Sequence, residues 1–350
     1  MTKNIVSVVL PKSNNAMSKA KEDITNILVN NGFNDISVTE PSNKFKKLNF
    51  NLLINKLKNY KWNANNDVLV FQYPTMLGPI INNYTMDWVL KNKINSIVII
   101  HDIDSIRFPN RKNYYSNLNN EINFFDKFNF IIVPNEAISK LLRSKGINGN
   151  KIIIMQIYDY LDSSILKKDD KFSINEQPFR VSFAGNLDKA TFLSKLKDIK
   201  TPIDVFGDFT TEMKFPKNVT YKGSKNPEEI SQYLSGFGLI WDGSSCDTCL
   251  GNYGKYLKYN SPHKLSLYIV SKIPVIIWKH AAMANFVEKN NIGFTIDKIS
   301  DIDEKLSKLT MHDYDILLKN VKDLSNKLLN GYFTLEAVNK SIEMLGKNNE

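Results

Sequence analysis

A run of cations and hydroxyl groups between two apolar segments is the part of the sequence best equipped for chemistry. The segments FGLIWDG (237–243) and IPVIIW (273–278) predict buried strands. Three lysines stand between them among several tyrosines: Lys255, Lys258 and Lys264. Ser261-Pro262 predicts the start of a helix, with Ser261 as N-cap and Pro262 at the first helical position. Since a helix N-terminus offers N–H groups to an anion, this segment predicts a diphosphate site.

The position of one lysine strengthens that interpretation. Lys264 falls in the first turn of the predicted helix, where a cation opposes the helix dipole. Such a placement is understandable if a phosphate is bound there and the neighbouring tyrosines contact a base or a sugar. The alternative is a basic surface loop with no ligand.

Polar residues follow a second apolar run in HDIDSIRF (101–108). His101 and Asp102 stand at the carboxyl end of a predicted strand, where open α/β sheets bind ligands, and we expect one of them to act in catalysis. Asp102 and Asp104 also form an Asp-x-Asp pair, which can hold a divalent metal against a diphosphate. Alternatively, one carboxylate caps a helix or pairs with Arg107.

A third strand end lies in FAGNL (183–187), where Gly185 and Asn186 are followed by Lys189. A glycine lets a ligand approach the backbone, and the lysine could contact a phosphate. A tight turn beside a solvated lysine explains the same residues equally well.

Other chemistries are disfavoured by missing patterns. The turn PKSNNAMSK after the first predicted strand has no glycine, so the dinucleotide fingerprint is absent, and so is a Walker A loop. Cys246 and Cys249 have C-x-x-C spacing, but a structural zinc needs about four ligands and the four histidines lie far off. A redox pair opening a helix is disfavoured because LGNYG is a poor helix start, so we expect two reduced thiols.

Strand-like and helical patterns alternate along nearly the whole chain and predict two α/β domains. The apolar strands are continuous, so helices should cover both faces of parallel sheets. We expect a first domain over 1–160 completed by a C-terminal helix at 331–350, a polar linker at 161–178, and a second domain at 179–330. Predicted helices of the first domain include 49–60, 84–92, 116–128 and 136–145.

Composition limits the partners and the compartment. The 350 residues carry a formal net charge of +10, which favours anionic partners. The cations are spread without a long Lys/Arg block, so we expect no nucleic acid. No segment approaches the roughly 20 apolar residues of a membrane span, and the apolar run at the N-terminus is too short for a signal peptide. These features predict a cytoplasmic protein with at most peripheral contact at the inner face of the membrane, and we expect it to form a homo-oligomer.

Several of these motifs together resemble a known family. YLKYNSPHK (256–264), KHAAMANFVEKNNIGFTI (279–296), IIHDIDSIRF (99–108) and FAGNL are similar to bacterial galactofuranosyltransferases of O-antigen and capsule assembly. They are more loosely similar to glucosyltransferases that extend glycans on serine-rich adhesins. The resemblance covers almost the whole chain and is most specific over 237–294.

The resemblance implies the GT-B architecture, in which two Rossmann-like, doubly wound domains face a cleft. It implies a metal-independent transfer of a hexosyl unit (galactofuranose, glucose or N-acetylglucosamine) from a UDP-sugar to a glycan or glycopeptide acceptor of a cell-surface polysaccharide or glycoprotein. The C-terminal domain would hold the donor and the N-terminal domain the acceptor, with no separate cofactor. Asp102 would be the base or acceptor-orienting group. The predicted donor site comprises Gly185, Asn186, Lys189, Lys255, Lys258, Asn260, His263, Lys264 and Ser266.

The residues favour group transfer over hydrolysis. Glycosidases use paired carboxylates, whereas this chain offers cations and helix amides where a diphosphate leaving group gains charge. A protein that binds a nucleotide sugar or a glycan without turnover remains the alternative function.

Overall fold

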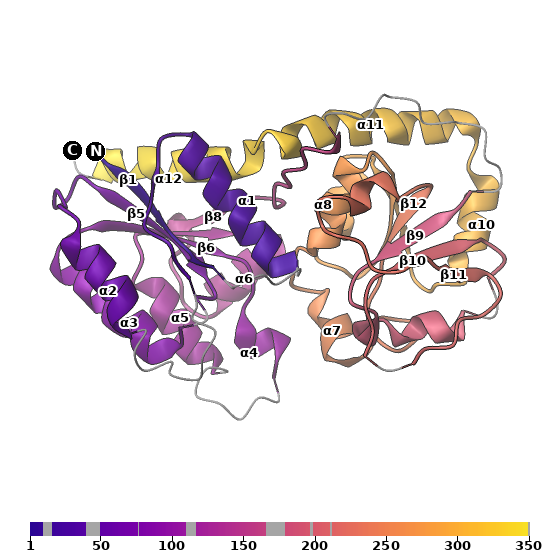
Figure 1. Ribbon diagram of the computed structural model, residues 1–350, viewed down its shortest axis with the longest axis horizontal. Coiled ribbons are helices and arrows are strands. Elements are labelled where there is room, and N and C mark those ends of the chain that lie inside the picture. The colour runs from indigo at the N-terminus through magenta and orange to yellow at the C-terminus, as the bar shows by residue number, and fades with distance from the viewer. Residues whose placement is uncertain are drawn as a thin grey trace. The chain divides into compact units, whose positions relative to one another are not determined.

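The computed structural model describes residues 1–9, 16–39, 50–75, 77–109, 117–165, 179–196, 199–210 and 212–348. The chain divides into two compact units (Figure 1). Unit 1 comprises Met1–Asp159 and Gly331–Glu350, and unit 2 comprises Tyr160–Asn330. Of the predicted linker 161–178, residues 166–178 lie outside the described residues.

Unit 1 is built on a six-stranded parallel sheet in the order β3-β1-β5-β6-β7-β8. Its central strands are buried along their whole length, as their continuous apolar runs predict. The strands are β1 (Lys3–Val6), β3 (Asn34–Asp35), β5 (Val68–Tyr73), β6 (Asn95–Ile100), β7 (Phe130–Val133) and β8 (Ile152–Ile154). A separate pair is formed by β2 (Val8–Val9) and β4 (Val38–Thr39).

The helices of unit 1 cover both faces of this sheet. Gln72 and Tyr73 on β5 show this, because neighbouring strand residues point to opposite faces: Gln72 contacts α1 and Tyr73 contacts α5. The helices are α1 (Ala16–Asn30), α2 (Phe50–Asn59), α3 (Pro79–Lys91), α4 (Asp104–Arg107), α5 (Leu118–Asp126), α6 (Glu136–Ser144) and the C-terminal α12 (Tyr332–Asn348).

Unit 2 is built on a second six-stranded parallel sheet, in the order β11-β10-β9-β12-β13-β14. Numbered along the unit, this is the doubly wound order 3-2-1-4-5-6 of dinucleotide-binding folds. The strands are β9 (Val181–Ala184), β10 (Ile203–Phe206), β11 (Val219–Tyr221), β12 (Phe237–Ile240), β13 (Val275–Trp278) and β14 (Gly293–Ile296). The helices are α7 (Gly251–Tyr256), α8 (His263–Val270), α9 (Ala284–Lys289), α10 (Asp301–Lys308) and α11 (Met311–Leu329).

The chain returns from unit 2 to unit 1 at Gly331, between α11 and α12. Gly331 has φ +70°, and a Cβ there would lie 2.7 Å from the Ile27 side chain, so glycine suits both the turn and the packing against α1. The carboxylate of Asp159, fully buried, accepts hydrogen bonds from the N–H groups of Phe333 (3.3 Å) and Thr334 (2.6 Å). This carboxylate caps the first turn of α12 and fixes its start on unit 1.

Several predicted boundaries are wrong. The helix predicted at 84–92 begins earlier, at Pro79, because proline suits the first turn of a helix. The predicted start at Ser261 is also wrong: the chain is extended at Pro262, with ψ 127°, so Pro262 is the N-cap and α8 begins at His263. The expectation that LGNYG does not start a helix is also wrong, because α7 begins at Gly251. Within α7, Gly254 packs so closely that a Cβ would lie 2.6 Å from the Cys249 carbonyl carbon.

The part of the chain that the structure describes contains no helix long and apolar enough to cross a membrane.

Candidate functional site

The carboxyl ends of β9 and β12 lie side by side at the centre of the unit 2 sheet. The strand order reverses between these two strands, and ligands of open α/β sheets bind at such a switch point. β9 is followed by Gly185, and β12 is followed by Trp241 and Asp242. Two of the predicted motifs, FAGNL and FGLIWDG, therefore end at one place.

Lys264 lies at this switch point. Its Nζ donates to the Asp242 carboxylate at 3.0 Å and to the Trp241 carbonyl oxygen at 3.3 Å, and it stands 4.5 Å from the centroid of the Phe183 ring. A Cβ built on Gly185 would lie 4.0 Å from this nitrogen. The lysine side chain is only 13% exposed, so a largely desolvated cation is held where the two strands end.

Buried polar atoms without a protein partner lie in the segments next to Lys264. Asn260 Oδ1 and Ser261 Oγ precede α8, and Trp278 Nε1 ends β13; none has a hydrogen-bond partner among the described residues. The Ser261 and Trp278 side chains are 5% and 2% exposed. Since buried polar groups are rarely left unpaired, these atoms indicate positions that a ligand or water would satisfy.

The other predicted donor residues lie on several segments of unit 2, and the structure gives them separate partners. Lys189 Nζ stands 4.8 Å from the Tyr253 ring centroid, and Lys258 Nζ stands 5.6 Å from that of Trp278. Asn186 precedes a short 3-10 helix, and Lys255 is exposed on α7. The His263 ring stacks on Tyr160 with centroids 4.9 Å apart, and Ser266 is buried in α8.

One supporting residue of this site had no sequence signal. The Tyr268 hydroxyl donates to the Leu239 carbonyl oxygen (3.2 Å) and accepts from the Ala184 N–H (2.9 Å), so it joins α8 to both central strands. Burial raises the pKa of Tyr268, and the hydroxyl stays protonated and able to donate. The ring lies over Gly238, where a Cβ would come within 2.2 Å of it.

Neither Cys246 nor Cys249 forms a disulfide bond. Cys246 donates a weak hydrogen bond to the Phe192 carbonyl oxygen at 3.7 Å, while Cys249 is buried. Burial raises the pKa of the Cys249 thiol, which opposes the thiolate that redox or metal chemistry requires. Among the described residues, no group of three or more His, Cys, Asp or Glu side chains could hold a metal ion.

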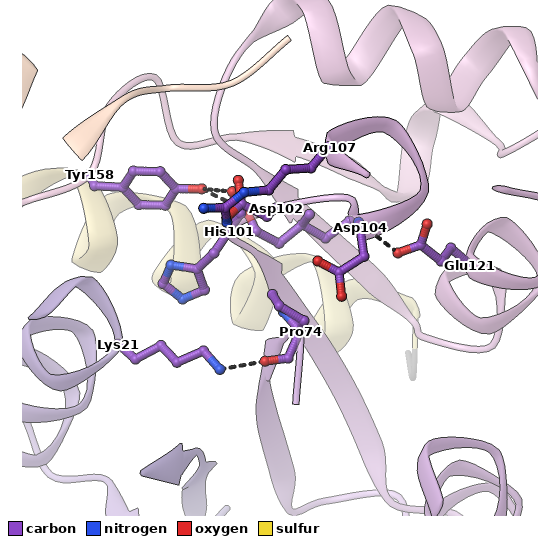
Figure 2. Close-up of polar contacts among 9 residues, drawn as sticks. Lys21, Pro74, His101, Asp102, Asp104, Arg107, Glu121 and Tyr158 are labelled. Atoms are coloured by element: carbon purple, nitrogen blue, oxygen red, sulfur yellow. Dashed lines mark hydrogen bonds and ion pairs between the residues drawn. The ribbon is translucent and has the colours of Figure 1, made fainter. Parts of the chain in front are cut away.

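In unit 1, His101 and Asp102 follow β6 as predicted (Figure 2). Asp102 forms an ion pair with Arg107, which was one of the alternatives that the sequence left open. The pair is mostly shielded from solvent, with side chains 15% and 19% exposed. His101 is buried and makes a hydrogen bond through Nε2 to Gln72 Oε1 at 2.8 Å.

Glu121, which sequence reasoning missed, holds the loop that carries these residues. From α5 its carboxylate accepts hydrogen bonds from the N–H groups of Asp104 and Ser105, both at 3.0 Å, and from the Tyr73 hydroxyl at 2.6 Å. Burial is the main cause that raises the pKa of Glu121. No local pattern marks Glu121, because its partners lie 16 to 48 residues away in sequence.

Lys21 was also missed. It is 4% exposed on α1, and its ammonium donates to the carbonyl oxygen of Pro74, the residue after β5. Gln72, the hydrogen-bond partner of His101, donates to the backbone carbonyl oxygen of this lysine, and Figure 2 shows the Lys21 ammonium directed at Pro74. The candidate site of unit 1 thus combines an imidazole, an ion pair and a buried ammonium at the carboxyl edge of the sheet.

Comparisons with known proteins cover both units. The family described as "Glucosyltransferase 3-like, N-terminal domain" matches residues 2–157, and "Glucosyltransferase 3-like, C-terminal domain" matches residues 181–341. The chain is 32% identical over 284 residues to the beta-1,6-galactofuranosyltransferase WbbI of Escherichia coli K12, covering 80% of this chain and 81% of that protein. It is 26% identical over 275 residues to glucosyltransferase 3 of Streptococcus gordonii, covering 77% of each.

Solved structures of GT-B glycosyltransferases share the fold. Sucrose-phosphate synthase from Thermosynechococcus elongatus superposes with a TM-score of 0.63 at 9% identity, covering 99% of this chain and all of that one. Anabaena Alr3699/HepE, solved with UDP and glucose, superposes with a TM-score of 0.61 at 12% identity, covering 98% of this chain and 100% of that one. The predicted fold class is confirmed.

Proposed function

Because the chain belongs to the glucosyltransferase 3-like family of GT-B glycosyltransferases, we propose that it transfers a hexosyl unit from a UDP-sugar to a glycan acceptor. The acceptor would be part of a cell-surface polysaccharide or glycoprotein. Galactofuranose and glucose are the sugars named in its relatives, and N-acetylglucosamine is a third candidate. Unit 2 would hold the donor and unit 1 the acceptor.

The observation that carries the donor assignment is Lys264 at the switch point of unit 2. Its ammonium has three N–H groups, of which two point to Asp242 and Trp241. The third can meet a phosphate oxygen, and Gly185 beside it lets the diphosphate approach the backbone. A cation held in place before the reaction stabilises negative charge without reorganisation.

Asp242 adjusts the strength of this contact. It neutralises Lys264 when no donor is bound, so the cation is not left buried and unpaired. A bound diphosphate would share the ammonium with Asp242. The unpaired atoms of Asn260, Ser261 and Trp278 would then supply polar contacts to the rest of the nucleotide sugar.

The transfer requires one proton acceptor and one stabilised leaving group. The acceptor hydroxyl oxygen forms a bond to the anomeric carbon, the bond from that carbon to the β-phosphate oxygen breaks, and its electron pair leaves with UDP. The hydroxyl proton passes to a base of unit 1, for which His101 and Asp102 are the candidates. Asp102 is already engaged by Arg107, so we assign the base to His101 and an orienting role to the ion pair.

Thermal unfolding with added nucleotides tests the donor proposal. UDP should raise the melting temperature of the protein, because a ligand that binds only the folded state stabilises it, whereas NAD should have no effect. A panel of UDP-sugars in the same assay would then identify the donor. Equal shifts with UDP and NAD, or no shift at saturating UDP, would contradict the proposal.

Turnover separates an enzyme from a binding protein. UDP release should be detected when the donor from that panel is incubated with an acceptor glycan. Binding without any release of UDP would favour the alternative of a non-catalytic nucleotide-sugar or glycan-binding protein.

A further inference from the structure

Gln72 connects His101 to helix α1 through a buried amide. Gln72 is 1% exposed and lies on β5, in register with Ile99 of the neighbouring β6. Because side chains alternate along a strand, Ile99 and the residue two positions on, His101, lie on the same face as Gln72. The amide therefore lies between the imidazole and α1, which covers that face.

The hydrogen bonds of this amide fix its orientation. Gln72 Nε2 donates to the Lys21 carbonyl oxygen at 3.1 Å and to Thr25 Oγ1 at 2.9 Å. The Lys21 carbonyl can only accept, and the Thr25 hydroxyl already donates its proton to that carbonyl at 2.8 Å. Both positions therefore require the N–H₂ end of the amide, and the carbonyl oxygen of Gln72 must face His101.

The tautomer of His101 follows from that orientation. Gln72 Oε1 lies 2.8 Å from His101 Nε2 and can only accept, so Nε2 must carry a hydrogen. In the neutral imidazole the lone pair is then on Nδ1. The ring plane is held by Tyr158, whose ring stacks on it with centroids 5.2 Å apart and planes 9° apart.

Tyr158 is itself held rigidly. Its hydroxyl donates to the carbonyl oxygens of Ile100 and His101, at 2.8 and 3.0 Å, so it follows the backbone that carries the imidazole. Burial raises the pKa of Tyr158, and the hydroxyl remains a donor throughout the working pH range. The stacked ring and the amide together leave the imidazole one orientation.

We propose that Gln72 is a positioning residue that holds His101 as its Nε2–H tautomer, so that Nδ1, a buried atom in this structure, is the ring nitrogen able to take the proton of the acceptor hydroxyl once the acceptor is bound against it. This rests on the proposed function. The O–H bond of the acceptor breaks as its oxygen bonds to the anomeric carbon, and the proton forms a new bond to Nδ1. The imidazolium keeps its Nε2–H bond to Gln72.

The neutral amide also sets how basic the ring is. A carboxylate in the same place would stabilise the imidazolium by charge, whereas the amide oxygen offers only a dipole. The other charged or titratable groups that Figure 2 draws with His101 are Lys21 of α1, the Asp102–Arg107 pair, Asp104, Glu121 of α5 and Tyr158. Their charges are the same in a Gln72 variant, so a change in the pH profile would report on the amide.

The first arm of the test needs no substrate. Long-range ¹H–¹⁵N spectra of the imidazoles give the tautomer directly, and the chain has only four histidines, so His101→Asn identifies the signal. We expect the Nε2–H form in the wild type and a mixture of tautomers in Gln72→Leu. A predominant Nδ1–H form in the wild type would overturn the proposal, whether or not the protein proves to be a transferase.

The second arm uses turnover. Gln72→Leu should lower kcat about 10- to 100-fold with KM nearly unchanged, a loss within the range of general base catalysis. Gln72→Glu should move the acidic limb of the rate–pH profile upward by about one pH unit, because an opposite charge favours the imidazolium. An unmoved profile in Gln72→Glu would show that His101 is not the base.

A matched control comes from the same sheet. Asn4 on β1 is also a fully buried amide, and its Nδ2 donates to the Val68 carbonyl oxygen at 3.4 Å, at the far end of β5. Asn4→Leu should cost stability but leave the His101 tautomer and the pH profile as they are. If Asn4→Leu changed them as much as Gln72→Leu does, general loosening of the sheet would explain both.

Discussion

Lys264 and His101 differ in what holds them, and that difference defines their separate roles. Lys264 is a cation balanced by one carboxylate at 3.0 Å, and a ligand phosphate can compete for it. His101 is a buried ring that forms a hydrogen bond to Gln72 through Nε2. We therefore expect the lysine to act in donor binding and the histidine in turnover.

Substitution of the proposed base should separate turnover from donor binding. His101→Asn should lower kcat by roughly 10²- to 10⁴-fold, as expected for loss of a general base. Asp102→Asn should have a smaller effect, because it removes only the orienting ion pair with Arg107. Both should bind UDP as the wild type does in calorimetric titrations, since both lie in unit 1. A larger loss of kcat in Asp102→Asn would transfer the role of base to Asp102.

At this scale the sequence indicated the candidate residues but not the partners that hold them. His101, Asp102 and Lys264 were recognisable because each follows a strand or begins a helix. Glu121, Lys21 and Gln72 were not, since their roles depend on contacts between elements that lie 16 to 53 residues apart. Such contacts leave no pattern within a short window.

The elements that position the proposed donor site meet where the Tyr268 ring packs on β12. Gly238 makes room for the ring, and the hydroxyl ties α8 to β9 and β12. The start of α8, and with it Lys264, is therefore placed by packing against the sheet. The Ser-Pro signal gave the approximate start of this helix, but the backbone of Pro262 set it one residue later.

Gly238→Ala should destabilise unit 2. The new Cβ would lie 2.2 Å from a Tyr268 ring that is fully buried and cannot move aside. Overpacking of this kind costs about 1–3 kcal/mol of unfolding free energy, sometimes more. Gly346→Ala on α12 is the control, because nothing lies within 4 Å of the added methyl group. Thermal unfolding of the two variants should differ clearly, and equal melting temperatures would show that the strand and helix can separate.

The cap of α12 should make stability depend on pH. Burial raises the pKa of Asp159 to about 6, so between pH 4 and 6 the folded state binds more protons than the unfolded state. The stabilisation that the protonated Asp159 carboxyl gives to the folded state is complete below about pH 4 and is lost as the pH rises through 6. This stabilisation amounts to about 2–3 kcal/mol of unfolding free energy, because a shift of one pKa unit corresponds to about 1.36 kcal/mol.

Urea denaturation of Asp159→Asn against the wild type between pH 4 and 7 measures this effect. As the pH rises across that range, the unfolding free energy of the wild type should fall relative to that of Asp159→Asn. Asp87→Asn, at a carboxylate whose side chain is 64% exposed, should run parallel to the wild type. Parallel curves for Asp159→Asn as well would mean that its carboxyl titrates normally.

Over the whole molecule, alternating apolar strands and helices were sufficient to predict two doubly wound units. Both sheets are parallel, as continuous apolar runs covered on two faces indicate, and each has six strands. The strand order within each sheet could not be predicted, because it depends on which strands pair across the chain. The order places the switch point of unit 2 between β9 and β12, where Lys264 lies and where we propose that the donor binds.

Transfer should be independent of divalent metal ions. A lysine and the amides at a helix start would supply the positive charge that a metal supplies in other transferases. Activity should therefore survive dialysis against EDTA. Loss of activity that Mg²⁺ or Mn²⁺ restores would assign Asp102 and Asp104 as metal ligands instead.

Calorimetric titration of UDP into Lys264→Met is the sharpest test of the proposal that Lys264 binds the donor diphosphate. Methionine keeps the apolar contact with Phe183 but removes the charge, and a lost charge-assisted hydrogen bond of about 1.5–3 kcal/mol should weaken UDP binding tenfold or more. Lys279→Met is the control, because that lysine is 57% exposed in a surface ion pair with Asp297. We expect weak binding by Lys264→Met and wild-type binding by Lys279→Met and His101→Asn. Wild-type affinity in Lys264→Met, together with lost binding in His101→Asn, would place the donor in unit 1 and contradict this proposal.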